Sequence, residues 1–100
     1  MKELPLACSL DETGMAAQRA RYAVVARHVQ SLASGERSLR ARLDETLDGA
    51  VLRELIEVER ECCPFFEIGY DATTRLLSFS VSTDEHAPAL QAIAHSLRTD

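Results

Sequence analysis

The spacing of the apolar residues switches between the period of a helix and the period of a strand along the chain, and this alternation constrains the fold more than any other feature. From Leu10 to about Ala33 the spacing is three or four residues, which predicts a first helix. This helix is expected to end at Ser34-Gly35, because glycine is common just after the end of a helix. The stripe consists of Met15, Gln18, Tyr22, Val25, Val29 and Leu32, with Gln18 as its one polar member.

A strand and a second helix are predicted next. Over residues 38–43, Leu39, Ala41 and Leu43 alternate with polar residues, which is typical of a half-buried strand. Asp48 can cap a helix that runs from Gly49 to about Cys63, and Pro64 ends it.

In this second helix we expect the face that carries Cys62 to be buried. Its row consists of Val51, Leu55, Val58 and Cys62, and a neighbouring row consists of Leu52, Ile56, Glu59 and Cys63. Consecutive helical side chains diverge by about 100°, so Cys63 is expected toward the flank of the helix. The three glutamates at positions 57, 59 and 61 are expected in solvent.

The last third of the chain predicts a hairpin and a helix. Residues 66–70 and 77–81 each alternate, and a short polar break separates them. A final helix begins at Asp84 or His86, with Pro88 near its start. Its predicted buried residues are Leu90, Ile93, Ala94 and Leu97.

These elements predict an α+β fold with the order α-β-α-β-β-α, in a single domain over residues 1–100. A helical crossover between the first two strands must be right-handed, and a return strand often inserts between them. We therefore expect a small three-stranded sheet of the split β-α-β type with the order 1-3-2. The alternative places strands one and two side by side and parallel. The two edges of so small a sheet are compatible with a homodimer.

The charge balance and the apolar runs exclude several partners. Sixteen acidic and 11 basic residues give a net charge of −5, which argues against the usual basic nucleic-acid binder. The basic strand over residues 38–43 also lacks aromatic residues for stacking on bases. No apolar run approaches the ~20 residues of a membrane span, and too few residues precede Cys8 for a secretory signal. We expect a cytoplasmic protein that binds neither nucleic acid nor membrane.

Cysteines are the most distinctive chemical groups of the chain, at Cys8, Cys62 and Cys63. Adjacent α-carbons lie ~3.8 Å apart, below the usual disulfide range that starts near ~4.4 Å, so a bridge between Cys62 and Cys63 is disfavoured. The acidic carboxyl end of a helix opposes a bare thiolate nucleophile, whereas a bound cation deprotonates the thiol. Cys8 can supply a third sulfur. Three thiols suit a soft ion such as mercury, arsenite or copper(I), and zinc needs a fourth ligand.

Several strings of the sequence resemble a family of small uncharacterised bacterial proteins. The resemblance covers most of the chain and is carried by Cys8-Ser9-Leu10, Arg19-Ala20-Arg21-Tyr22, residues 59–66 and Tyr70-Asp71. That family shares an N-terminal cysteine and a Cys-Cys-Pro-Phe motif and is associated with heavy-metal response and resistance. The resemblance implies that Cys8, Cys62 and Cys63 are thiolate ligands of a metal.

Three functions follow as hypotheses. The first is a thiol domain that binds a soft metal or metalloid ion through Cys62 and Cys63, with Cys8 as the third ligand. The second is a thiol redox protein that uses the adjacent pair. The third is a structural or partner-binding module in which the cysteines fill the core. No motif for catalysis is present, so the question of an enzyme stays open.

Overall fold

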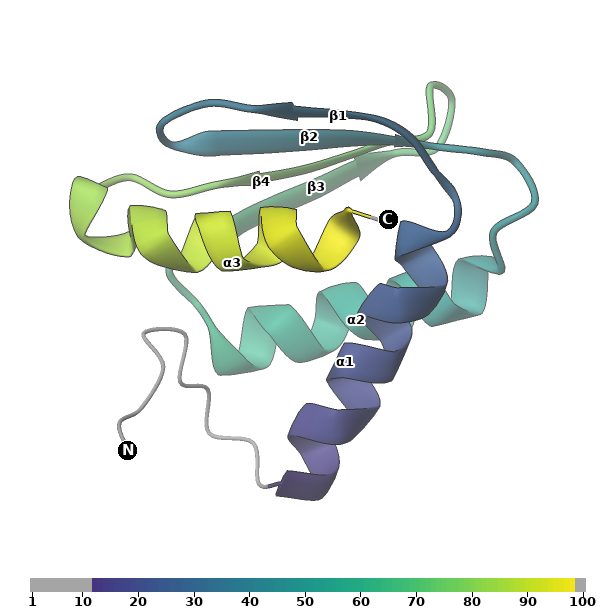
Figure 1. Cartoon of the computed structure of the whole chain (residues 1–100), viewed down its shortest axis with the longest axis horizontal. Coiled ribbons are helices and arrows are strands. Elements are labelled where there is room, and N and C mark those ends of the chain that lie inside the picture. Colours follow the sequence, from purple (N-terminus) through teal and green to yellow (C-terminus); the bar gives the residue numbers. More distant parts are fainter. Residues whose placement is uncertain (1–11, 99–100) are drawn as a thin grey trace.

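The computed structural model describes residues 12–98, and the order of their main elements is α-β-β-α-β-β-α (Figure 1). The predicted order α-β-α-β-β-α is wrong because it lacks one strand. The elements are α1 (Glu12–Ala26), β1 (Val29–Ser34), β2 (Ser38–Leu43), α2 (Gly49–Cys62), β3 (Glu67–Asp71), β4 (Leu76–Ser80), a 3-10 turn η1 (Asp84–His86) and α3 (Ala87–Leu97).

The four strands form one antiparallel sheet with the order β1-β2-β4-β3. Each hairpin pairs two consecutive strands, and the hairpins join where Leu39 of β2 lies opposite Phe79 of β4. The predicted three-stranded sheet with the order 1-3-2 is therefore wrong, and so is the parallel alternative. Helix α2 connects two hairpins, so it is not a crossover between parallel strands, and the handedness rule does not apply to it.

Strand β1 occupies the region where the sequence predicts the end of the first helix. Helix α1 ends at Ala26, and the backbone N–H of His28 donates to the oxygen of Val25 at 2.9 Å. The register of β1 against β2 shifts between Val29 and Ser31, which marks a β-bulge with one extra residue in β1. The bulge lets Val29 and Leu32 both pack against the core, although they are three residues apart. A helix produces the same spacing.

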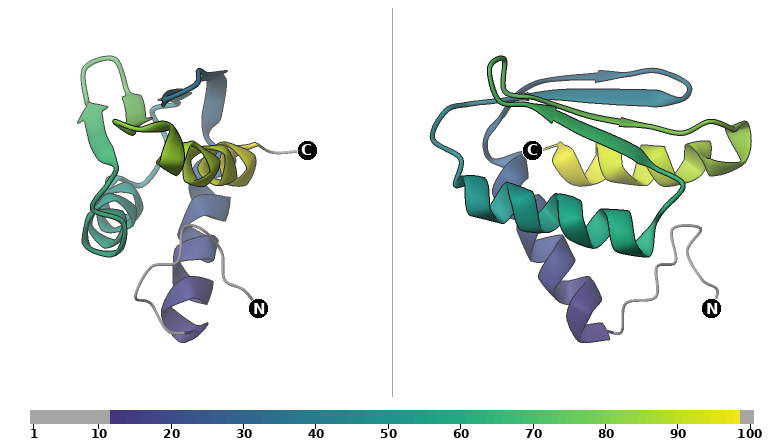
Figure 2. Two further views of the ribbon diagram at one scale, coloured as in Figure 1. Left: turned by 90° about the vertical axis from the view of Figure 1, so that its left-hand side faces the viewer. Right: turned by 180° about the vertical axis from the view of Figure 1, so that it is seen from behind.

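All three helices lie on one face of the sheet (Figures 1 and 2). Helix α2 runs below β3, helix α3 lies against β1 and β2, and α1 crosses below and packs against both other helices. The predicted start of α2 is confirmed, since the side chain of Asp48 accepts a hydrogen bond from the N–H of Ala50. Within residues 12–98, no helix combines the length and the apolar character that a membrane span requires.

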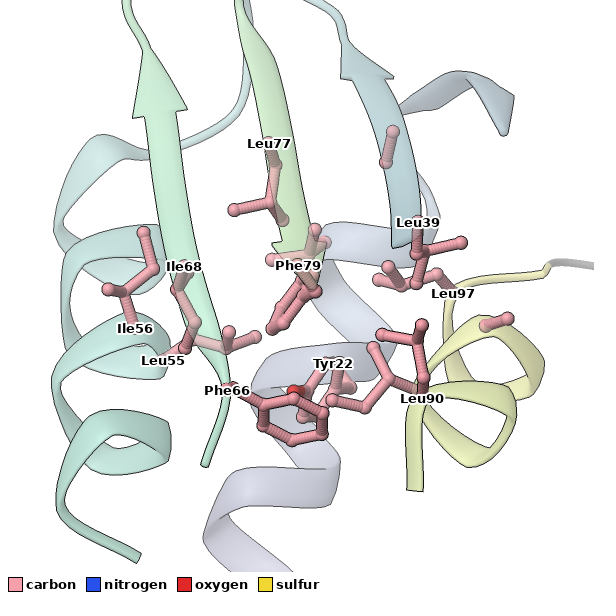
Figure 3. Close-up of a cluster of buried hydrophobic side chains, with 14 of the residues drawn as sticks. Tyr22, Leu39, Leu55, Ile56, Phe66, Ile68, Leu77, Phe79, Leu90 and Leu97 are labelled. Atoms are coloured by element: carbon pink, nitrogen blue, oxygen red, sulfur yellow. The ribbon is translucent and has the colours of Figure 1, made fainter. Parts of the chain in front are cut away.

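The core lies between the sheet and the helices (Figure 3). Phe79 projects from the inner strand β4 and contacts the ring of Phe66 edge-on, with 5.8 Å between the ring centroids. The predicted buried face of the last helix is confirmed, because Leu90, Ile93, Ala94 and Leu97 are all buried.

The loop after β2 is tied to the end of α1. The N–H of Asp44 donates to the oxygen of His28 at 2.9 Å. The carboxylate of Asp44 accepts hydrogen bonds from the hydroxyl and the N–H of Thr46, and its Oδ1 lies 3.0 Å from Nδ1 of His28. The bond from the Thr46 hydroxyl, followed by the contact with His28, lowers the pKa of Asp44 below its ordinary value of 3.8.

We expect Thr46→Val to raise the pKa of Asp44 toward its ordinary value. A carboxyl whose pKa is lowered by folding stabilises the fold above the unfolded pKa and loses this contribution as the pH falls through the folded pKa. The free energy of unfolding of the variant should therefore differ most from that of the wild type near neutral pH and least below about pH 3. An NMR titration of the Asp44 carboxyl carbon measures the shift. Thr73→Val is the matched control and should leave the titration of Asp44 unchanged.

Candidate functional site

The two adjacent cysteines lie at the end of α2, but their burial is the reverse of what the sequence predicts. Cys62 is the last helical residue and is half-buried, whereas Cys63 is fully buried in the core. The expectation that Cys62 belongs to the buried row and Cys63 to the flank is wrong. The buried side of α2 is centred on Leu52, Leu55, Ile56 and Glu59, so Val51 and Val58 lie at its margin.

The helix ends between the two thiols. The backbone of Cys63 has φ −130° and ψ 71°, so it has left the helical region. Its N–H donates to the oxygen of Glu59 at 2.7 Å, and its oxygen accepts from the N–H of Phe66 at 3.1 Å. No disulfide joins Cys62 to Cys63.

Aromatic rings surround the turn that follows the thiols. The ring of Phe65 stacks on the imidazole of His86, with centroids 4.1 Å apart and planes 9° apart. Phe65 also contacts Phe66 at 4.7 Å, and Phe66 contacts Phe79 in the core. The segment over residues 64–66 therefore connects the thiols to η1 on one side and to the sheet on the other.

The predicted metal ligands are only partly within the described residues. Cys62 and Cys63 are adjacent, but Cys8 lies outside residues 12–98. Among residues 12–98, no three His, Cys, Asp or Glu side chains are grouped closely enough to hold a metal ion. These residues supply the two neighbouring thiols, and Cys8 as the third ligand stays a prediction.

A buried polar cluster joins α1 to α2 one turn before the thiols. Glu59 is 7% exposed, and its Oε2 accepts hydrogen bonds from the hydroxyl of Tyr22 at 2.9 Å and from Nε2 of Gln18 at 3.1 Å. The same amide nitrogen of Gln18 lies 3.0 Å from the backbone oxygen of Leu55. The expectation that Glu59 faces solvent with Glu57 and Glu61 is wrong, because this face of α2 packs against α1.

Arg21 closes the cluster toward solvent. Its Nη1 donates to Oε1 of Gln18 at 2.6 Å, and its Nη2 lies 3.4 Å from Oε2 of Glu54. The sequence carries a signal for this cluster, since Gln18 is the one polar member of the apolar stripe on the first helix. A polar residue in a buried stripe needs a partner on the facing element, and here Glu59 is that partner.

Comparisons of the chain with protein-family models, with curated proteins and with solved structures gave no match. The resemblance of the Cys-Cys-Pro-Phe segment to metal-associated bacterial proteins therefore stays a prediction.

Proposed function

We propose that the protein binds a soft metal or metalloid ion, namely mercury, arsenite, copper(I) or zinc, through the thiolates of Cys62 and Cys63, with Cys8 as the third ligand. The observation that carries the proposal is the end of α2 between the two cysteines. Consecutive side chains of a continuous helix diverge by about 100°, but this limit does not apply to a pair whose second member has left the helix.

The charges around the thiols support a bound cation better than a free thiolate. Glu57, Glu61 and Glu67 are exposed near the same end of α2, where the helix dipole is also negative. A soft cation deprotonates the thiols, and these carboxylates then stabilise its charge. Oε2 of Glu59 already accepts two hydrogen bonds from α1, so we assign the metal to sulfur ligands.

Native mass spectrometry of the reduced full-length chain tests this proposal. We expect one ion of mercury(II), arsenite, copper(I) or zinc to bind per chain. Cys62→Ser and Cys63→Ser should each weaken this complex at least about 100-fold, because each removes a thiolate ligand. His95→Gln, at an exposed imidazole of α3, is the control for adventitious binding and should leave the complex unchanged.

Cys8→Ser separates the three-sulfur site from a two-sulfur site. Weakened binding supports Cys8 as the third ligand, and unchanged binding assigns the ion to Cys62 and Cys63 alone. The absence of a 1:1 complex with all four ions contradicts the proposal, and so does equal binding by the wild type and both serine variants of the adjacent pair. Loss of two thiols together under oxidant, without metal, favours a redox pair instead.

The full burial of Cys63 favours a second candidate, in which this cysteine fills the core. On this reading, Cys63→Ala lowers the free energy of unfolding by about 1–2 kcal/mol, because it leaves a small cavity. Urea unfolding followed by circular dichroism measures the loss. A Cys63→Ala variant that is destabilised and still binds the ion like the wild type assigns Cys63 to packing and leaves Cys62 as the ligand.

A further inference from the structure

A cavity of about 400 Å³ with a mixed polar and apolar lining lies along α2, beside the buried side of this helix. Its lining includes Leu52 and Ile56 of α2, Tyr70 of β3 and Arg75 of the turn after β3. Figure 3 shows Ile56 of α2 next to Ile68 of β3. Leu47 of the loop between β2 and α2 also lines the cavity. Such a volume suits a small organic molecule.

Three arginines line this cavity: Arg53, Arg60 and Arg75. Nη2 of Arg60 donates to the backbone oxygen of Ile68 at 2.8 Å, which anchors it at the open edge of β3. Nε of Arg75 is buried, and among residues 12–98 it has no hydrogen-bond partner. Within the same residues, no carboxylate lies within 4.0 Å of a nitrogen of these three arginines. None of the three is therefore held in a direct ion pair among these residues.

Arg75 occupies a backbone conformation that its side chain does not favour. Its φ is 58°, in the left-handed region where glycine and asparagine are preferred. Hydrogen bonds of the turn hold it there. The carboxylate of Asp71 accepts from the N–H of Thr73, and the backbone oxygen of Arg75 accepts from the N–H of Leu43. An arginine in this position breaks the local preference of the turn, and such exceptions concentrate at functional sites.

Carboxylates on the cavity wall restrict the charge of a ligand. Asp44, Glu45 and Glu57 also line the cavity. The formal charges of these three carboxylates balance those of the three arginines. Asp44 is already bound to Thr46 and His28, whereas Glu45 and Glu57 are exposed to solvent. A multiply charged phosphate would meet repulsion from these groups. A single negative charge on an apolar body fits the cavity better.

We propose that this cavity binds a small monocarboxylate with an apolar or aromatic body. The two terminal Nη groups of the Arg75 guanidinium form a planar fork that can pair with both oxygens of a carboxylate. The apolar body then lies against Leu52, Ile56 and Tyr70, and Tyr70 is 38% exposed without a ligand. This site is separate from the thiols and does not depend on the proposed metal.

NMR titration of the full chain with phenylacetate tests the proposal. We expect saturable shifts at the Nε–H signal of Arg75, at Tyr70 and along residues 49–60 of α2. Phenylacetamide has the same shape without the charge and should bind at least about tenfold more weakly. Inorganic phosphate is the probe for a general anion site. Phosphate that binds more tightly than phenylacetate overturns the assignment to a carboxylate, and phenylacetamide that binds equally well overturns the role of the charge.

Arg75→Asn removes the guanidinium while it suits the left-handed backbone, so its melting temperature should equal or exceed that of the wild type. We expect it to bind phenylacetate at least about tenfold more weakly. Arg53→Gln is a second variant on the helical wall and should weaken binding in the same direction. Arg40→Gln, an exposed arginine on the opposite face of the sheet, is the matched control and should bind like the wild type. Wild-type affinity in both Arg75→Asn and Arg53→Gln excludes the site.

Discussion

Glu59→Ala is expected to lower the free energy of unfolding by about 3–5 kcal/mol. The substitution leaves the hydroxyl of Tyr22 without this acceptor and removes one of the two acceptors of the Gln18 amide, in an interface that is largely closed to water. Hydrogen bonds to a charged acceptor contribute about 1.5–3 kcal/mol each, and the substitution removes two of them. Urea unfolding followed by circular dichroism measures the difference.

Glu57→Ala is the matched control for this prediction. Glu57 lies on the same helix two residues earlier, but it is exposed, so its loss should change the stability by no more than about 0.5 kcal/mol. Glu59→Gln keeps one carbonyl acceptor and should lie between the two alanine variants. If Glu57→Ala and Glu59→Ala have equal effects, the cluster does not hold α1 against α2.

Phe79→Ala is expected to cost about 3–5 kcal/mol of stability. Phe79 is 1% exposed on the inner strand β4, where it pairs with Leu39 on one side and with Ile68 on the other. Its ring also contacts the edge of Phe66. The substitution therefore opens a cavity at the point where both hairpins and the aromatic turn after the thiols meet, and few neighbours can move to fill it.

Chemical denaturation with two probes checks this prediction, near-ultraviolet circular dichroism for the aromatic rings and far-ultraviolet circular dichroism for the backbone. Ser78→Ala is the control, since Ser78 precedes Phe79 in β4 and its side chain lies on the other face of the sheet. It should change the free energy of unfolding by less than about 1 kcal/mol. A Phe79→Ala variant as stable as Ser78→Ala contradicts the core described here.

Local signals in the sequence were sufficient for several elements of the fold. Asp48 and Pro64 bound α2, and the regular alternation over residues 66–70 and 77–81 predicts the second hairpin. Strand β1 could not be recognised in the same way, because its bulge gives Val29 and Leu32 a helical spacing. Without this strand, the predicted sheet order of 1-3-2 was wrong from the start. The handedness rule applies to parallel crossovers and could not reveal the error.

The candidate sites depend on which face of α2 packs against α1. The sequence places the two cysteines side by side, but the three alternating glutamates of this helix point to a solvated flank. Glu59 is buried where Gln18 and Tyr22 of α1 donate to it, and the sequence does not contain that pairing explicitly. The sequence does not indicate the left-handed backbone of Arg75 either, because contacts of the turn impose it.

The pairing of β2 with β4, which joins the two hairpins, also has a consequence for synthesis on the ribosome. Strand β2 is complete long before its second neighbour β4 emerges, and at about 5–20 residues per second the delay lasts a few seconds. During that interval one edge of β2 exposes its backbone N–H and C=O groups to other chains. Arg40 and Arg42 lie on this strand, and their charges oppose pairing between nascent copies. We therefore expect the two arginines to oppose aggregation of the incomplete chain before the sheet is closed.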